Sequence, residues 1–100
     1  IVYNYGVSKA DSYLVMYVRP NGLNENRLGI SVSKKIGNSV VRHHLTRLIR
    51  ESYRLSEERF HIGWDLVVVV RKRAAHATYH QIDESLLKLA GLHNLIREEN

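Results

Sequence analysis

Alternating apolar and polar positions predict two strands in the first third of the chain. Residues 13–19 carry apolar side chains on both sides of the alternation, so this strand should be at least partly covered on each face. Residues 27–33 place Leu28, Ile30 and Val32 on one face and the small residues Gly29, Ser31 and Ser33 on the other. Turn-forming residues fill positions 20–26, and we expect the second strand to pair back on the first. Residues 1–12 show no clear period and are expected to form a loop.

A helix is predicted from Asn38 or Ser39 to about Ser56. Gly37 and Asn38 interrupt the preceding strand, and either Asn38 or Ser39 can accept hydrogen bonds from a first helical turn. The apolar residues then recur at helical spacing on one face, and arginines occupy the adjoining face. This pattern describes a helix with one core face and one cationic face. On a helical wheel His44 falls just outside the apolar arc.

The second half of the chain predicts one more strand and one more helix. Residues 65–71 contain four consecutive valines, which is typical of an interior strand buried on both faces. Thr78 and Gln81 form a capping box for a last helix, with Gly91 as its expected C-cap. The order strand, strand, helix, strand, helix indicates an α/β (α+β) two-layer sandwich with helices packed on a mixed sheet. One hundred residues make one domain, spanning 1–100.

The positive charge of the chain is concentrated in the predicted helix and the turn before it. Residues 33–54 contain six Lys and Arg against one acidic residue, which equals the net charge of +5 of the whole chain. Such a local excess points to a polyanionic partner. The alternative is a solvated helix face, but that usually interleaves both signs of charge. Arg71, Lys72 and Arg73 add a second basic spot after the valine strand.

Several classes of function find no support in the residues. The chain has no cysteine, no apolar run long enough to span a bilayer and no signal-peptide pattern, so we expect a soluble, cytoplasmic protein. Six histidines raise the alternative of a stand-alone nuclease, but none has the metal-ligand or acid–base spacing of a recognisable active site. A DNA-binding module that inserts the basic helix into a major groove is a further alternative, although no companion helix is predicted.

Residues 27–54, RLGISVSKKIGNSVVRHHLTRLIRESYR, resemble the signature segment of the bacterial ribonuclease P protein component. The shared pattern is R-x-G-x-S-V-S-K-K-x-G-x-(A/S)-V-x-R followed by R-L-I-R-E. The opening VYNYGVSKADSYLVMYV and the DLVVVVR and AAHATYHQI segments also look like their family counterparts. The resemblance covers essentially the whole chain, which is expected to lack the family's N-terminal helix. It implies that the basic helix connects two parallel strands by a left-handed crossover, against the usual right-handed preference.

The resemblance also implies a function. The chain is expected to be the protein subunit of a ribonucleoprotein endonuclease, a hydrolase that removes the 5′ leader of precursor tRNA. The catalytic RNase P RNA would perform the cleavage with Mg²⁺, and the protein would have no catalytic residue of its own. Its expected partners are that RNA and precursor tRNA, with no membrane and no obligate protein partner. The protein would bind the single-stranded leader in a cleft formed by the sheet and the basic helix.

The same resemblance assigns site residues. Those of the leader cleft are Tyr3, Tyr17, Ser31 and Ser33. The RNA-facing residues are Lys34, Lys35, Asn38, Arg42, His43, His44, Arg47 and Arg50. The family usually has Arg-Asn-Arg where this chain has Arg42, His43 and His44, and often has Lys in place of Thr46. We therefore expect RNA contacts at His43 and His44 that strengthen below the usual histidine pKa of about 6.5.

Overall fold

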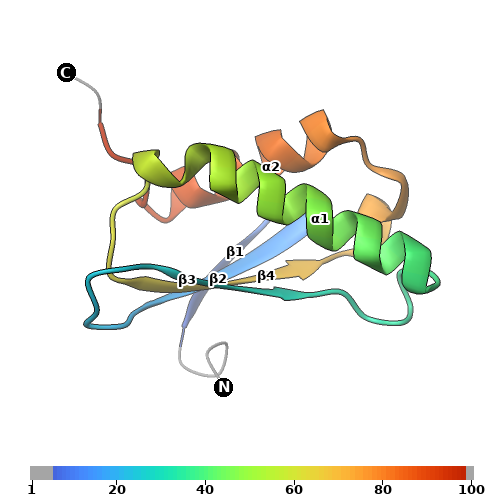
Figure 1. The fold of residues 1–100 in the computed structure, drawn as a ribbon, viewed down its shortest axis with the longest axis horizontal. Helices are drawn as coiled ribbons and strands as arrows, with labels where there is room; N and C mark the ends of the chain where they lie inside the picture. The colour runs from blue at the N-terminus through green and yellow to red at the C-terminus, as the bar shows by residue number, and fades with distance from the viewer. Residues whose placement is uncertain (1–5, 99–100) are drawn as a thin grey trace.

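The sheet has four strands in the spatial order β1-β2-β4-β3. The computed structural model describes residues 6–98. The strands are β1 (Val7–Ala10), β2 (Leu14–Pro20), β3 (Arg27–Ser31) and β4 (Trp64–Val70). The helices are α1 (Ser39–Ser56) and α2 (Tyr79–Leu92), with short 3-10 turns η2 (Glu57–Arg59) and η3 (Lys72–His76). Both helices lie on the same side of the sheet (Figure 1), which confirms the mixed two-layer α+β architecture.

Two predictions about which segments pair in the sheet were wrong. Residues 7–10, expected as loop, form β1, which pairs antiparallel with β2. The strand β3 does not pair back on β2. It pairs parallel with β4, which lies between them and is antiparallel to β2. The apolar β4 takes the interior position because both of its edges and one of its faces are covered, whereas the exposed, polar residues of β3 suit an edge.

The β3–α1–β4 segment forms a crossover between two adjacent parallel strands. Its left-handed sense, implied by the family resemblance, stays a prediction. Because β3 and β4 are parallel, their carboxyl ends lie at the same edge of the sheet. The turn that leaves β3 and the turn that leaves β4 therefore lie at this common edge.

The core lies between the sheet and the two helices. Alternate residues of β2 and β4 point into it, and α1 contributes Leu45 and Ile49, both fully buried. The other large buried side chains are Leu14, Met16, Val18, Ile36, Phe60, Leu66, Val68, Val70, Ile82, Leu86, Leu89 and Leu95. The predicted apolar faces of both helices are thus confirmed. Between the helices, the buried Ser52 Oγ donates a 2.7 Å hydrogen bond to Asp83 Oδ1.

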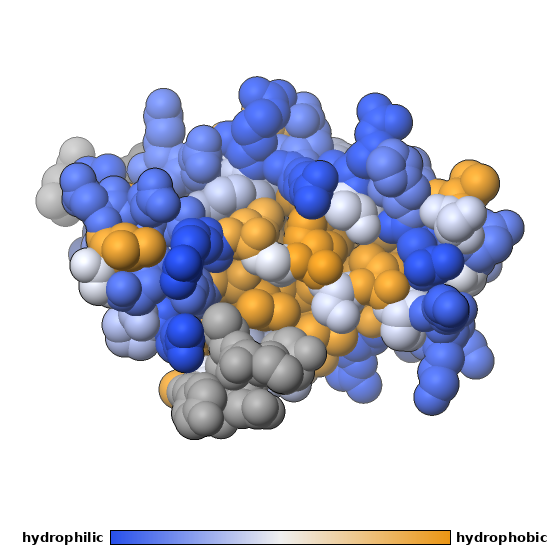
Figure 2. Space-filling model, turned by 60° about the horizontal axis from the view of Figure 1, so that its bottom comes forward, coloured by the Kyte–Doolittle hydropathy of each residue, from blue (hydrophilic) through white to orange (hydrophobic). Residues whose placement is uncertain are grey.

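The opposite face of the sheet is not covered by any element of residues 6–98. Here Val15 and Tyr17 of β2 and Val67 and Val69 of β4 are only half-buried. Figure 2 shows the result, an apolar patch surrounded by hydrophilic residues on the side of the molecule away from the helices. The expectation that the valine strand is buried on both faces was therefore wrong. We call this surface the open sheet face.

Capping explains where the helices begin. Asn38 Oδ1 accepts a 3.0 Å hydrogen bond from Val41 N, and Thr78 and Gln81 make the predicted reciprocal capping box. The expected C-cap at Gly91 was wrong, because α2 continues to Leu92. Asn94 supplies the left-handed residue, at φ 58°. Asparagine tolerates this conformation better than most side chains.

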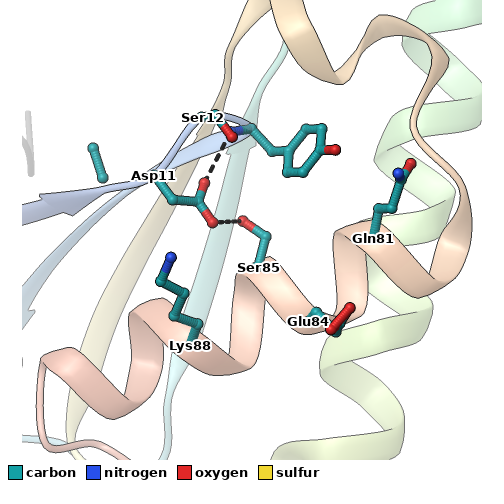
Figure 3. Close-up of a pocket in the computed structure, with 8 residues that line it drawn as sticks. Asp11, Ser12, Gln81, Glu84, Ser85 and Lys88 are labelled. Carbon is teal, nitrogen blue, oxygen red and sulfur yellow. Dashed lines mark hydrogen bonds between the residues drawn. The ribbon is translucent and has the colours of Figure 1, made fainter.

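A polar cluster joins the β1–β2 turn to α2 (Figure 3). Asp11 accepts hydrogen bonds from Tyr13 N and Leu14 N at 2.9 Å and from Ser85 Oγ at 2.6 Å. Burial favours the neutral acid, but these donors outweigh it and lower the pKa of Asp11. Together with Lys88, the cluster lines a hollow of about 500 Å³. Since the carboxylate already has three donors, we assign this cluster a structural role.

Candidate nucleic-acid interface

The arginines of α1 differ in whether they form an ion pair or a hydrogen bond with another residue of the protein. Arg47 and Arg50 are exposed, and neither forms an ion pair with any residue of the described range 6–98. Arg54 is paired with Glu51. Arg42 is half-buried, and its Nε donates a 3.3 Å hydrogen bond to the carbonyl of Gly37. The outer surface of α1 therefore keeps free positive charge, mainly at Arg47 and Arg50.

His43 and His44 are both exposed on the outer surface of α1. They line a hollow of about 580 Å³ together with Ser39, Val40 and Arg47. The wheel placed His44 near the edge of the core, but the structure exposes it. The two histidines and Arg47 thus form one continuous surface, although the pH dependence expected of the histidines stays a prediction.

The turn between β3 and α1 presents Lys34 and Lys35 to solvent. Ile36 is buried and its N–H donates to the carbonyl of Ser33 at 3.1 Å, so the turn is anchored in the core while its lysines point outward. Asn38 follows as the helix cap, with its side-chain oxygen already accepting a hydrogen bond. Asn38 therefore shapes the turn, whatever further contact it makes.

The second basic spot lies at the same edge of the sheet. Arg71 follows β4, and its Nη1 donates a 2.8 Å hydrogen bond to the carbonyl of Asp11. Lys72 and Arg73 are exposed in η3, and neither forms an ion pair with a residue of the described part of the chain. No acidic residue occurs in positions 31–47 or 71–78. The sequence marked this spot but did not place it in the site; the parallel pairing of β3 with β4 brings it to the edge that also carries Lys34 and Lys35.

The open sheet face contains the predicted cleft residues that the structure describes. Tyr17 lies opposite Val67, which lies opposite Gly29, and in the next row Val15, Val69 and Ser31 are aligned. Ser31 and Ser33 are exposed. The small side chains leave the backbone of β3 accessible beside an apolar, aromatic surface. Tyr3 lies outside the described residues.

These residues form two surfaces rather than the single groove that was expected. The small residues of β3 point to the open sheet face, while α1 packs on the other face. The two surfaces meet at the edge that carries Lys34 and Lys35. A partner that contacts both must pass around this edge.

One carboxylate lies at the far end of the open sheet face. Asp65 is only 4% exposed and accepts hydrogen bonds from Arg27 Nε and Nη2 at 2.8 and 2.9 Å and from Asn21 Nδ2 at 3.1 Å. The hydrogen bonds from Arg27, reinforced by Asn21 and by the positive charge of Arg19, lower the pKa of Asp65 to about 2. The carboxylate is therefore ionised at neutral pH and internally neutralised.

Mg²⁺, expected from the family resemblance, finds no ready set of protein ligands. Within residues 6–98 no three His, Cys, Asp or Glu side chains converge into a group that could hold a metal ion. Asp65 and Asp11 are occupied by internal donors. In the same part of the chain, neither helix combines the length and apolar character needed to cross a membrane.

Comparison with known proteins agrees with this arrangement. Residues 1–93 match the family model described as Ribonuclease P. The ribonuclease P protein component of Lachnoclostridium phytofermentans is 55% identical over 95 residues, covering 95% of this chain and 82% of the relative. That of Caldanaerobacter subterraneus is 49% identical over 88 residues, covering 88% and 76%.

Solved structures give the same result. The RNase P protein of Staphylococcus aureus superposes with a TM-score of 0.88 at 34% identity, covering 96% of this chain and 88% of that one. The RNase P protein of Thermotoga maritima gives a TM-score of 0.83 at 33% identity, covering 88% and 84%. The family match, the sequence identity over nearly the whole chain and the shared fold leave one assignment: this chain belongs to the ribonuclease P protein family.

Proposed function

We propose that this chain acts as the protein subunit of a ribonuclease P ribonucleoprotein, which removes the 5′ leader of precursor tRNA. In this proposal the outer surface of α1 binds the catalytic RNA subunit and the open sheet face binds the single-stranded leader. The observation that carries the proposal is the free charge on α1: Arg47 and Arg50 are exposed and have no carboxylate partner within residues 6–98.

The two surfaces suit two kinds of RNA. Guanidinium groups on a convex helix can donate to phosphates of a folded RNA, whose bases are mostly paired and inaccessible. The open sheet face has the complementary properties, because its apolar residues and Tyr17 can contact unpaired bases. Lys34 and Lys35 lie where the two surfaces meet, so they are placed to contact phosphates near the point at which leader and RNA subunit approach each other.

The protein's part in the reaction is then binding and positioning. Cleavage of the phosphodiester, which leaves a 5′-phosphomonoester on the tRNA, is assigned to the RNA subunit. Mg²⁺ would supply charge stabilisation for that step. The basic side chains of this chain lower the repulsion between two polyanions, so the complex should need less free Mg²⁺ to assemble productively.

Reconstitution tests the proposal. The protein is added to a bacterial RNase P RNA at a Mg²⁺ concentration at which the RNA alone is inactive, and 5′ processing of a precursor tRNA is measured. We expect processing to be restored. RNA binding without restored processing would favour a stand-alone nucleic-acid-binding module, and cleavage by the protein without RNA would favour a nuclease. Tighter binding to duplex DNA than to leader RNA would favour the DNA-binding alternative.

A further inference from the structure

The end of the open sheet face that lies away from Lys34 and Lys35 carries two arginines that share one carboxylate. Asp65 of β4 lies opposite Arg19 of β2 and opposite Arg27 of β3, so the three side chains form one row across the sheet. The row therefore has a net charge of +1. On the same face of the sheet, the neighbouring row is formed by Tyr17, Val67 and Gly29.

The Asp65 carboxylate accepts hydrogen bonds from Arg27 but none from Arg19 Nε. Arg27 donates to both oxygens of Asp65, at 2.8 and 2.9 Å, and Asn21 donates a third hydrogen bond at 3.1 Å. Arg19 Nε forms an ion pair with Asp65 Oδ2 at 3.6 Å, beyond hydrogen-bond distance, and this buried nitrogen has no hydrogen-bond partner within residues 6–98. A buried donor without an acceptor costs free energy, and one explanation for it is a ligand that supplies the acceptor.

The surroundings of Arg19 have room for such a ligand. A hollow of about 320 Å³ lies at this row, lined by the two arginines, Asp65, Gly29 and Val67 among others. The side chain of Arg19 is 37% exposed, so part of its guanidinium group faces solvent while Nε is buried. The exposed Glu25 lies within electrostatic reach of Arg27. Arg19 is therefore the member of the row best placed to receive an anion.

We infer that Arg19 binds a phosphate of single-stranded RNA lying on the open sheet face, and that this is a second anchor point, remote from Lys34 and Lys35. Tyr13, whose carbonyl accepts from Arg71 N, directly precedes β2, and the six residue steps from Arg19 to Tyr13 cover about 20 Å. Basic residues thus stand at both ends of an apolar platform. A strand of several nucleotides can place phosphates at the two ends and bases against the residues between them. This inference rests on the proposed leader-binding role of the open sheet face.

The arrangement makes a prediction about leader length. If the basic edge with Lys34 and Lys35 lies nearest the RNA subunit, the leader reaches Arg19 only after it has crossed the platform. A leader of one or two nucleotides cannot contact Arg19, whereas a leader of about ten nucleotides can. The contribution of Arg19 to affinity should therefore appear only with long leaders.

The experiment measures the affinity of the reconstituted holoenzyme for precursor tRNAs with leaders of one, two, five and ten nucleotides. Arg19→Gln should weaken binding of the ten-nucleotide leader by about three- to fivefold, the effect of a partly exposed charge contact. It should reduce the log–log salt slope by about 0.7. With one or two nucleotides Arg19→Gln should bind like the wild type. Arg19→Lys should keep most of the salt slope but lose part of the affinity, because it keeps the charge and loses the planar fork.

Arg59→Gln is the matched control, since Arg59 is exposed in η2 and lies outside both proposed surfaces. Folding should survive Arg19→Gln because Asp65 keeps its donors from Arg27 and Asn21, and thermal unfolding checks this. A loss that is equal at all leader lengths, or no loss at ten nucleotides, overturns the role of Arg19 while leaving the proposed function standing. A wild-type protein that is indifferent to leader length overturns the leader-binding role itself, and the anchor with it.

Discussion

Glu51 binds the guanidinium group of Arg54 through two hydrogen bonds, at 3.0 Å to Nε and 2.8 Å to Nη2. Glu51 is the one acidic residue in the basic stretch 33–54, and the pairing lowers its pKa, so it is ionised at neutral pH. It therefore removes one of the positive charges that the helix would otherwise present. We infer that α1 binds RNA with one arginine fewer than its sequence suggests.

Replacing Glu51 by Gln should strengthen binding to the RNA subunit. The substitution removes a negative charge from the proposed interface and releases Arg54, so the log–log salt slope should increase by about 0.7 to 0.9 for one additional phosphate contact. Affinity measured over a series of salt concentrations checks this. Glu58→Gln is the control, because Glu58 is exposed in η2, outside the interface. If both variants raise affinity equally, only net charge matters and the local pairing does not.

The arginines of α1 should differ in their contribution to RNA binding. Arg50→Met removes an exposed guanidinium group that has no carboxylate partner within residues 6–98, so affinity and salt slope should both fall, the slope by about 0.7 to 0.9. Arg54→Met removes a group that Glu51 already neutralises, and its effect should be smaller. Both substitutions keep much of the aliphatic stem, so the helix should remain folded. Equal losses in the two variants would contradict the assignment of free charge to Arg50.

A side chain at Gly29 should separate stability from leader binding. A Cβ there would lie 3.7 Å from Val67 Cγ2 and 3.9 Å from the carbonyl of Leu66, which are ordinary contacts. Gly29→Val should therefore stabilise β3 by about 0.5–1 kcal/mol, because valine favours strands and glycine does not. The same side chain would stand on the open sheet face and obstruct an RNA strand.

Thermal unfolding and leader affinity measured on the same variants test both expectations. Gly29→Ala is the intermediate control, with a smaller gain in stability and a smaller loss in binding. A variant that gains stability and binds the leader as the wild type does would show that RNA does not approach β3 at this position.

The sequence predicts features that depend on residues close together in the chain better than features that depend on residues far apart. Thr78 was recognised as a cap, and Asn38 as one of two candidates with Ser39, because each bonds to a residue three positions away. The local pattern wrongly suggested a hairpin of β3 with β2, because a turn-rich segment separates these strands. The parallel relation of β3 and β4 joins residues separated by a whole helix, so it could be expected only from the family resemblance. The run of valines predicted an interior strand correctly, but four apolar residues in succession do not reveal whether a second layer covers the outer face.

The same limit applies to the candidate site. Charge counting found the basic helix, and the family motif supplied its residues. Neither could show that Arg54 is neutralised by Glu51 while Arg47 and Arg50 are not, because ion pairing depends on side-chain geometry. The row of Arg19, Asp65 and Arg27 was also missed. It joins three strands, and no local pattern marks residues so far apart in the chain.

Asp65 should give the stability of the fold a distinct pH dependence. Its pKa in the folded protein is about 2, below the ordinary value of 3.8, chiefly because Arg27 donates to the ionised form. A carboxyl group whose folded pKa is lowered stabilises the protein at pH values above its unfolded pKa, and that stabilisation is lost as pH falls from about 4 to about 2. Since Arg27 is partly exposed and solvent screens the pair, we expect a contribution of about 1–2 kcal/mol at pH 7.

The measurement compares denaturant unfolding of the wild type and Asp65→Asn at pH 7, 5, 4 and 3. The asparagine variant should be less stable at pH 7, and the difference between the two proteins should shrink at pH 4 and further at pH 3, as Asp65 is protonated in the unfolded wild type. Glu58→Gln, at an exposed carboxyl group, should show no comparable pH-dependent difference. A difference that is constant from pH 7 to pH 3 would mean that Asp65 stabilises the sheet through its shape and neutral hydrogen bonds, and that its charge is not what holds Arg27 at the end of the open sheet face.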